Sequence, residues 1–364
     1  MENCSAKIAM PQEHHQISTA SSSDPPQGEH GEINHPHDDP FEDDSAIGSD
    51  IESLTQTLNS EVLDFEYSNG RRYNAFKNGT YLLPNDEVEV ERLDIQHKMW
   101  TLILSGKLYL APLNEDEIHD VVDIATGTGN WAIDFADAHP QARVIGTDLS
   151  PIQSSFVPQN LEFIVEDSEM DWMFTRPFDF IHSRAVAAGW KDWPNYFRQA
   201  FNHLKPGGWI EIQDLYFMSD ASETCDDGTV KNDHPLVRLS RYMIEGGLKM
   251  GFDMRKVQYA ASMLKDAGFV DIHQVNLKFP WTEWPEQEPL KTVGRLMTKN
   301  MVETGGLSAV GLGILTKKLG WSREKAELFL MEGRNALKDT TQHCYSPVIV
   351  VYARKPSETG SPGA

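Results

Sequence analysis

Short runs of β-branched and other apolar residues alternate with helical segments from residue 121 onward. Five such runs come in order, with segments of helical spacing among them: 121–125, 143–149, 161–167, 178–184 and 209–216. Two more runs, 270–279 and 347–355, are separated by a long helical stretch and could form a closing pair at a sheet edge. This alternation is typical of βαβ units, so the pattern predicts an α/β fold.

Helical spacing also precedes the first strand. Leu54, Leu58, Val62 and Phe65 recur every three or four residues, and a second apolar stripe runs through residues 89–110. Apolar residues at this spacing predict amphipathic helices. We therefore expect a helical N-terminal cap over residues 51–115.

Two helical insertions are expected within the sheet domain, which we assign to residues 116–357, followed by a flexible C-terminus at 358–364. The insertions cover 217–265 and 285–340 and contain many methionine and aromatic residues. Because they follow the fifth and sixth strands, we expect them to roof the active-site end as a lid. Methionine suits an apolar acceptor pocket, although it more commonly fills a helical core.

Charge separates the first 50 residues from the rest. The chain has 32 Lys+Arg against 55 Asp+Glu, a formal net charge of −23, and residues 1–50 contain eleven acidic residues and one basic residue, Lys7. With so few apolar residues, this segment is predicted to be a disordered acidic tail, which would suit a protein partner. We interpret its five histidines as part of a solvated polar tract, so no metal site is assigned. The acidic balance disfavours direct nucleic-acid binding.

The remaining composition indicates a protein of a reducing compartment. No window approaches the apolar length that a membrane-spanning helix needs, and the N-terminus lacks the features of a signal peptide. Only Cys4, Cys225 and Cys344 are present, without a paired CxxC spacing. Neither a disulfide framework nor a thiolate zinc site is expected. We therefore expect a cytoplasmic protein, with the nucleus as the alternative location.

A glycine-containing turn joins the first strand to the following helix. It includes Ala125, Thr126, Gly127 and Gly129. Glycine permits a tight turn and close approach of a ligand to the backbone, which predicts a nucleotide-like cofactor. The turn also matches the loose dinucleotide pattern through Ala132, so by itself it leaves a nicotinamide cofactor and S-adenosylmethionine (SAM) both open. A purely structural turn is a third reading.

Acidic residues at three strand ends favour SAM. Asp123 precedes the turn, where a carboxylate suits a cationic ligand better than a pyrophosphate. Asp148, followed by Leu149, ends the second strand at the placement where a carboxylate can accept both ribose hydroxyls. Asp167 and Ser168 end the third strand, where an acid can accept from an adenine amino group and an amide can donate to the ring. Asp148 has an ordinary structural alternative as a helix N-cap or turn residue, and Asp167 has one as a strand-end turn residue.

Several blocks together carry a resemblance to a known family. DIATGTGNWAIDFA, VIGTDLSPIQ, LEFIVEDSEMDW, FDFIHSR and FRQAFNHLKPGGWIEIQD resemble the successive motifs of class I SAM-dependent methyltransferases, and NGRRYNAFKNGTYLLPNDEVEVERLDIQHKMW resembles the N-terminal block of the fungal LaeA-like methyltransferases. The similarity runs from about Asn69 to Leu215 and then weakly through PVIVVYARK. It implies a seven-stranded Rossmann-like methyltransferase sheet whose last hairpin inserts one antiparallel strand.

Ala125 departs from the family pattern. It occupies the position of the usual first glycine of the loop. Alanine is strained where the backbone needs a positive φ, so we expect a strained loop if this position requires one.

Methyl transfer from a sulfonium is an in-line displacement that depends mainly on alignment, so a general base is optional. His182, at the end of the fourth strand, is the tentative catalytic base, with cofactor contact or simple packing as alternatives. His97 is a second choice. Trp172, Trp190, Trp193 and Tyr81 are candidates for aromatic walls, since a sulfonium is attracted to an aromatic face, although each taken singly is more typical of a core.

Three functions stay open at this point. The first is methyl transfer to an oxygen or nitrogen of a small-molecule acceptor in fungal secondary metabolism, as the resemblance implies. The second is a LaeA-type nuclear regulator in which the acidic tail binds a protein partner. The third is a nicotinamide-dependent oxidoreductase, which the turn permits but Asp123 disfavours.

Overall fold

The computed structural model describes residues 65–68, 70–74 and 83–357. The chain divides into two units, Met1–Asp50 and Ile51–Ala364, and all the elements below belong to the second. The predicted acidic tail, its histidines and Tyr81 lie outside the described residues.

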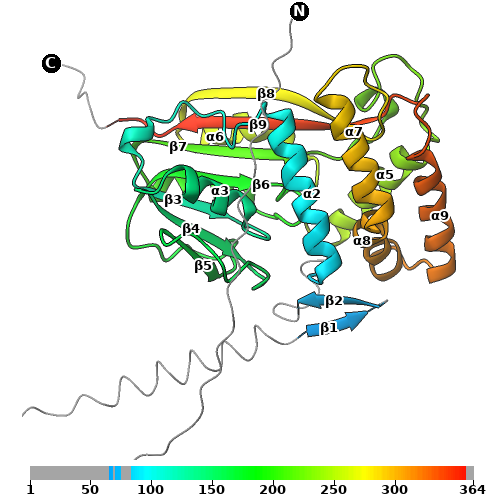
Figure 1. The fold of residues 1–364 in the computed structure, drawn as a ribbon, viewed down its shortest axis with the longest axis horizontal. Coiled ribbons are helices and arrows are strands. Elements are labelled where there is room, and N and C mark those ends of the chain that lie inside the picture. Colours follow the sequence, from blue (N-terminus) through cyan, green and yellow to red (C-terminus); the bar gives the residue numbers. More distant parts are fainter. Residues whose placement is uncertain (1–64, 69, 75–82, 358–364) are drawn as a thin grey trace, which may run out of the picture. The chain divides into compact units, whose positions relative to one another are not determined.

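A seven-stranded sheet forms the centre of the fold (Figure 1). Its order is β5-β4-β3-β6-β7-β9-β8, in which β9 alone runs antiparallel to its neighbours. The strands are β3 (Asp120–Ile124), β4 (Arg143–Asp148), β5 (Leu161–Val165), β6 (Phe178–Arg184), β7 (Leu204–Leu215), β8 (Val270–Pro280) and β9 (Tyr345–Arg354). The predicted fold, including the inserted antiparallel strand, is confirmed.

Helices cover both faces of the sheet because successive strand residues point to opposite sides. Val121 and Phe180 face α3 (Asn130–Ala138), whereas Val122 and Ile181 face α4 (Trp193–His203). The chain order reverses between β3 and β6, and ligands of open α/β sheets bind at the carboxyl ends of the strands beside such a reversal.

A third core joins helix α2 (Glu87–Ile103) to the inserted helices. These are α5 (Pro235–Lys249), α7 (Leu290–Thr298), α8 (Gly306–Gly313) and α9 (Arg323–Ala336), with π-helical turns η4 (Lys299–Glu303) and η5 (Ile314–Lys318). They pack beside the far ends of β8 and β9 (Figure 1). Within the described part of the chain, no helix is long and apolar enough to cross a membrane.

The first predicted insertion is only partly a lid. Its last part, η3 (Lys256–Tyr259) and α6 (Ala260–Asp266), packs with α4 against the sheet through Val257 and Leu264. The reason is that these side chains supply apolar cover for β8 and β9, so this part of 217–265 completes the sheet domain.

The N-terminal region also differs from the predicted helical cap. Phe65 begins strand β1 (Phe65–Ser68), which pairs with β2 (Arg71–Asn74) in a hairpin. The sequence has Asn-Gly directly before β2, a strong hairpin signal that the helical interpretation overlooked. Asp86, the N-cap of α2, accepts from the Glu89 amide and binds the Arg71 guanidinium at 2.6 Å, which ties the hairpin to the helix.

Candidate active site

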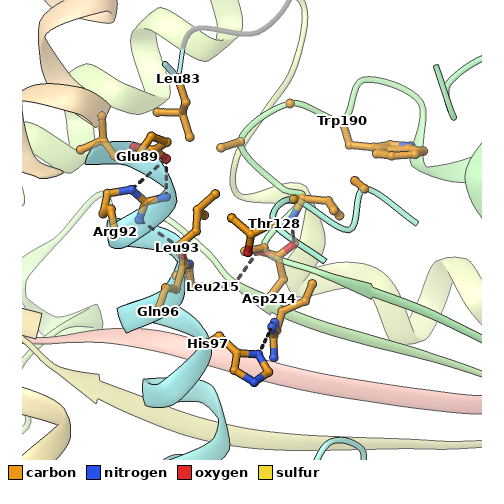
Figure 2. Close-up of a pocket in the computed structure, with 18 of the residues that line it drawn as sticks. Leu83, Glu89, Arg92, Leu93, Gln96, His97, Thr128, Trp190, Asp214 and Leu215 are labelled. Carbon is orange, nitrogen blue, oxygen red and sulfur yellow. Dashed lines mark hydrogen bonds and ion pairs between the residues drawn. The ribbon is translucent and has the colours of Figure 1, made fainter. Parts of the chain in front are cut away.

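A cavity of about 500 Å³ opens at the carboxyl ends of β3 and β6. The turn after β3, the ends of β4, β6 and β7, one face of α2 and the helices α5, α7 and η4 contribute to its wall. Figure 2 shows the α2 side chains Glu89, Arg92, Leu93, Gln96 and His97 along one side, with Thr128, Asp214 and Trp190 opposite.

The turn after β3 presents its backbone to this cavity. Ala125, Thr126 and Gly127 line it, and the Thr126 amide donates to the Thr147 carbonyl at 2.8 Å. Ala125 has φ of 57°, so the alanine does occupy a left-handed conformation. The strain expected from the sequence is therefore present.

Gly129 is placed differently from the prediction. It lies behind the turn and is absent from the cavity wall that the structure describes. Its φ is +82°, and a β-carbon at this position would overlap the ring of Phe163. The glycine is thus required by packing against β5.

Asp148 lies in the cavity wall at the end of β4. Its carboxylate accepts from the Gly127 amide at 2.8 Å and from the Ser150 amide at 3.0 Å. Burial raises the pKa of Asp148 to about 6, partly opposed by these amides. The carboxylate oxygens retain lone-pair capacity toward the cavity, as ribose hydroxyls would need.

Leu149, Asp167 and Ser168 line the same part of the cavity. Asp167 accepts from the Glu169 amide at 3.0 Å, and the Ser168 hydroxyl lies 3.1 Å from that of Thr147. The ends of β4 and β5 therefore bring together the side chains that the sequence placed around a nucleoside.

Asp123 and His182 lie beneath the turn and outside the cavity wall. The His182 Nδ1–H donates to Asp123 at 2.7 Å, and Thr126 donates to the other oxygen of Asp123 at 2.6 Å. The His182 ring is fully buried and stacks on Trp131 of α3, with ring centroids 3.7 Å apart. Burial also lowers the pKa of His182. The structure thus gives His182 no route to an acceptor, and Asp123 supports the turn from below rather than facing a ligand.

Arg184 enters the site although the sequence gave it no role. It ends β6, lines the cavity, and its guanidinium donates to His97 Nδ1 at 2.8 Å. His97 Nε2 in turn lies 2.8 Å from Asp134, so both ring nitrogens are engaged. Burial lowers the pKa of Arg184 to about 10. A strand-end arginine beside the glycine turn was the available signal.

Asp214, at the end of β7, is a second residue that the sequence analysis missed. One of its oxygens accepts from the amides of Val186 and Ala187, each at 2.8 Å, and the other accepts from the Leu215 amide. Burial raises the pKa of Asp214 to about 7. This carboxylate fixes the segment after β6 that forms the cavity wall.

The rest of the wall is apolar and lies under the inserted helices. Trp190 belongs to it, whereas Trp172 and Trp193 are buried in the core between α4 and the sheet. The members of this apolar wall include Trp100, Met243, Phe279, Trp281, Met297 and Met301.

The residues present fit SAM better than a dinucleotide. The Gly127 amide is bound by Asp148, and a second carboxylate, Asp123, lies directly beneath the turn. Negative charge at this place opposes a pyrophosphate and suits a ligand that carries a sulfonium. A strand-end carboxylate, a further acid and a cavity-lining arginine match the hydroxyl, amino and carboxylate groups of SAM.

An open α/β sheet with this strand order and this cavity defines a protein of the class I methyltransferase type. A family model described as methyltransferase domain matches residues 95–274. "Methyltransferase pytC" of Aspergillus terreus is 38% identical over 315 residues, which cover 86% of this chain and 95% of that protein. "Probable methyltransferase tdiE" of Emericella nidulans is 36% identical over 290 residues, 78% and 88% of the two chains. "Protein-methionine methyltransferase laeA" of the same organism is 31% identical over 316 residues, 85% and 81%.

The chain therefore belongs to the fungal LaeA-like family of methyltransferases. It is a SAM-dependent methyltransferase, and the nicotinamide-dependent alternative is not favoured.

Proposed function

We propose that this enzyme transfers a methyl group from SAM to an oxygen or nitrogen of a small molecule in fungal secondary metabolism. The observation that carries the proposal is the cavity itself, which continues from the polar strand ends of β4 and β5 into an apolar space under α5, α7 and η4. Its volume of about 500 Å³ falls within the usual range for small-molecule sites. The names of two relatives, pytC and tdiE, agree with this class.

The cofactor contacts follow from the charges in the wall. Asp148 would accept the ribose hydroxyls, and Asp167 with Ser168 would bind the adenine edge. Arg184, whose guanidinium contacts the His97 ring and lies over the Trp100 ring, would bind the carboxylate of the methionine part, because a buried guanidinium is stabilised by an anion. Thr126, Gly127 and Leu149 would contact the cofactor through their backbone atoms and through van der Waals packing. Bound SAM supplies a methyl group on a positively charged sulfur.

The protein's part in the reaction is mainly alignment. Methyl transfer would form a bond from the nucleophile to the methyl carbon as the carbon–sulfur bond breaks, with the electron pair of that bond kept by sulfur and the nucleophile's proton passing to water. His97 is the histidine among the described residues of the wall, and both of its ring nitrogens already have hydrogen-bond partners, so neither is free to accept this proton. Asp214 is similarly occupied by three amides. Such a site suits an acceptor that ionises readily, such as a phenol or enol, because it needs little help from a base.

A regulatory role of the LaeA type is the second candidate. Met170 lines the cavity and is 60% exposed, so the cavity meets the protein surface beside a methionine side chain of the protein itself. A relative is named as a protein-methionine methyltransferase and others as secondary metabolism regulators. In this case residues 1–50 would bind a protein partner and the protein would act in the nucleus; in the biosynthetic case we place it in the cytoplasm.

Incubation with SAM labelled in the methyl group separates the two functions. The purified full chain is mixed with a small-molecule extract of the producing fungus, and the label is followed in metabolites and in protein. The biosynthetic proposal expects label in a small molecule. The Asp148→Ala variant should transfer much less label, and the surface variant Asp137→Ala should transfer as much as the wild type. Label confined to protein would overturn it in favour of the regulatory role.

A further inference from the structure

A second polar part of the cavity wall lies near the start of α2 and in η4. Asn85, Glu89 and Asn300 line the cavity and are each at most 3% exposed. Within the described residues, no hydrogen-bond partner is found for Asn85 Nδ2, Glu89 Oε2, or Asn300 Nδ2 and Oδ1. Buried polar groups in folded proteins are nearly always satisfied, so four such atoms in one cavity wall indicate a ligand.

The fold brings these three residues together. Asn85 directly precedes Asp86, the N-cap of α2, and Glu89 lies in the first turn of that helix. Asn300 lies in the π-helical turn η4, which contacts α2. Arg92 connects the two elements. Its guanidinium binds Glu89 Oε1 at 2.7 Å (Figure 2). Its Cδ and the Asn300 carbonyl both lie against Gly306. Single π-turns inside helices are often found at functional sites.

The cluster lies apart from Arg184, the residue to which the carboxylate of the cofactor is assigned. Glu89 precedes His97, the partner of Arg184, by eight residues on α2. At 1.5 Å per residue this is about 12 Å along the helix axis. The cluster therefore belongs to the acceptor part of the cavity, next to the apolar wall that includes Met301.

The free atoms specify the chemistry of the group they would bind. Glu89 Oε2 can only accept a hydrogen bond and Asn85 Nδ2 can only donate one, while the Asn300 amide can do both. The matching ligand group carries an N–H or O–H donor beside a carbonyl acceptor. Glu89 disfavours a carboxylate at this place, and its pairing with Arg92 leaves little net charge to attract a cation.

We propose that Asn85, Glu89 and Asn300 anchor the methyl acceptor through an uncharged lactam or similar N–H and carbonyl pair at one end of an apolar, ring-containing body. This inference rests on the proposed function, since it names the class of acceptor for the same cavity. A site built to bind such a group rejects analogues that lack its donor, because the protein atoms are then left unpaired.

Titration calorimetry in saturating S-adenosylhomocysteine tests the anchor without turnover. The probes are 2-quinolone, its N-methyl derivative and naphthalene, which share a bicyclic body but differ in the donor and the carbonyl. The full-length enzyme is expected to bind 2-quinolone about tenfold more tightly than either analogue. Equal affinities for the three probes, or no binding of 2-quinolone, would overturn the anchor.

Two variants and a control identify the residues. Asn300→Leu is expected to abolish the preference for 2-quinolone and to raise the melting temperature, because it removes unpaired buried polar atoms. Glu89→Gln should weaken the preference. Thr282→Val is the matched control, since the Thr282 hydroxyl is also buried and unpartnered among the described residues but lies outside the cavity wall. It should raise the melting temperature and keep the preference.

The outcomes separate the anchor from the proposed function. Failure of the wild-type enzyme to bind S-adenosylhomocysteine would contradict the cofactor assignment itself. Normal binding of that ligand by every variant, with the 2-quinolone preference kept in Asn300→Leu, would reject the anchor alone.

Discussion

Arg184 provides the sharpest prediction for a single residue. Replacing it with glutamine removes the positive charge beside the glycine turn. This change is expected to lower the affinity for S-adenosylhomocysteine about 10- to 100-fold, the scale of a charge-assisted hydrogen bond. 5′-Methylthioadenosine lacks the carboxylate, so its affinity should stay the same. Calorimetric titration of both ligands measures the difference, with exposed Arg198→Gln as the control. An equal loss for both ligands would show that Arg184 acts only on the shape of the site.

Ala125 provides a prediction about backbone strain. Its φ of 57° costs an L-residue about 1 to 2 kcal/mol, which glycine avoids. Glycine also gains freedom in the unfolded chain, which opposes folding by roughly 0.5 to 1 kcal/mol. Ala125→Gly is therefore expected to raise the free energy of unfolding by about 0.5 to 1 kcal/mol in chemical denaturation. The control Ala138→Gly, in helix α3, should lower it, and a loss of stability in both variants would contradict the assigned strain.

At the scale of the elements, helix α7 forms one wall of the acceptor space and depends on a glycine. Gly294 faces the Thr282 carbonyl so closely that a β-carbon would overlap it, while Val293 and Met297 of the same helix face the apolar core. The absence of a side chain at Gly294 therefore sets the distance between α7 and the segment after β8.

Gly294→Ala is expected to push α7 outward and to lower the free energy of unfolding by about 1 to 3 kcal/mol, as overpacking usually does. Affinity for S-adenosylhomocysteine should change little, because the displaced helix lines the acceptor part of the cavity. Thermal unfolding and titration measure the two effects. Loss of cofactor affinity without loss of stability would contradict this placement of α7.

Several elements were predictable because their signals are local. The strand 178–184 was predicted with the bounds that it has in the structure, and six other runs were within a few residues. The hairpin at Phe65 was missed because three or four apolar positions fit a helical spacing by chance over so short a window. The packing position of α6 could not be predicted from the sequence. Which core an amphipathic helix covers depends on the apolar surfaces that the rest of the fold leaves open.

For the whole molecule, three buried carboxyl groups set the direction of the pH dependence. Burial raises the pKa of Asp148 to about 6 and of Glu211 and Asp214 to about 7, above the usual values near 4. Between pH 4 and 7 these three groups bind more protons in the folded state than in the unfolded state. Burial lowers the pKa of His139, His182 and His234, and these groups act in the opposite direction only below the usual histidine value of about 6.5, so stability falls as the pH rises above it.

The melting temperature of the free protein is accordingly expected to be higher at pH 6 than at pH 8. The net charge of −23 acts in the same direction, so the comparison is made in about 0.5 M salt, which screens surface charges much more than buried ones. Glu211→Gln, which removes one of the three carboxyl groups, should flatten the dependence. A melting temperature that is constant or rises from pH 6 to pH 8 would show that these carboxyl groups do not titrate as their burial implies.

The sequence by itself determined the class of fold and brought three candidate cofactor residues to one edge of the sheet. The alternation of strands and helices and the rule that parallel strands end at one edge predict that Asp148, Asp167 and Ser168 lie near one another, and they line one cavity. Only the tertiary structure decided which way Asp123 and His182 face. They are paired in register on the side of the sheet that Trp131 covers, and a shift of one residue would have turned them to the other side. Arg184, Asn85 and Asn300 come from segments far apart in the chain, and their common cavity exists only because the packing of α2 against η4 brings them together.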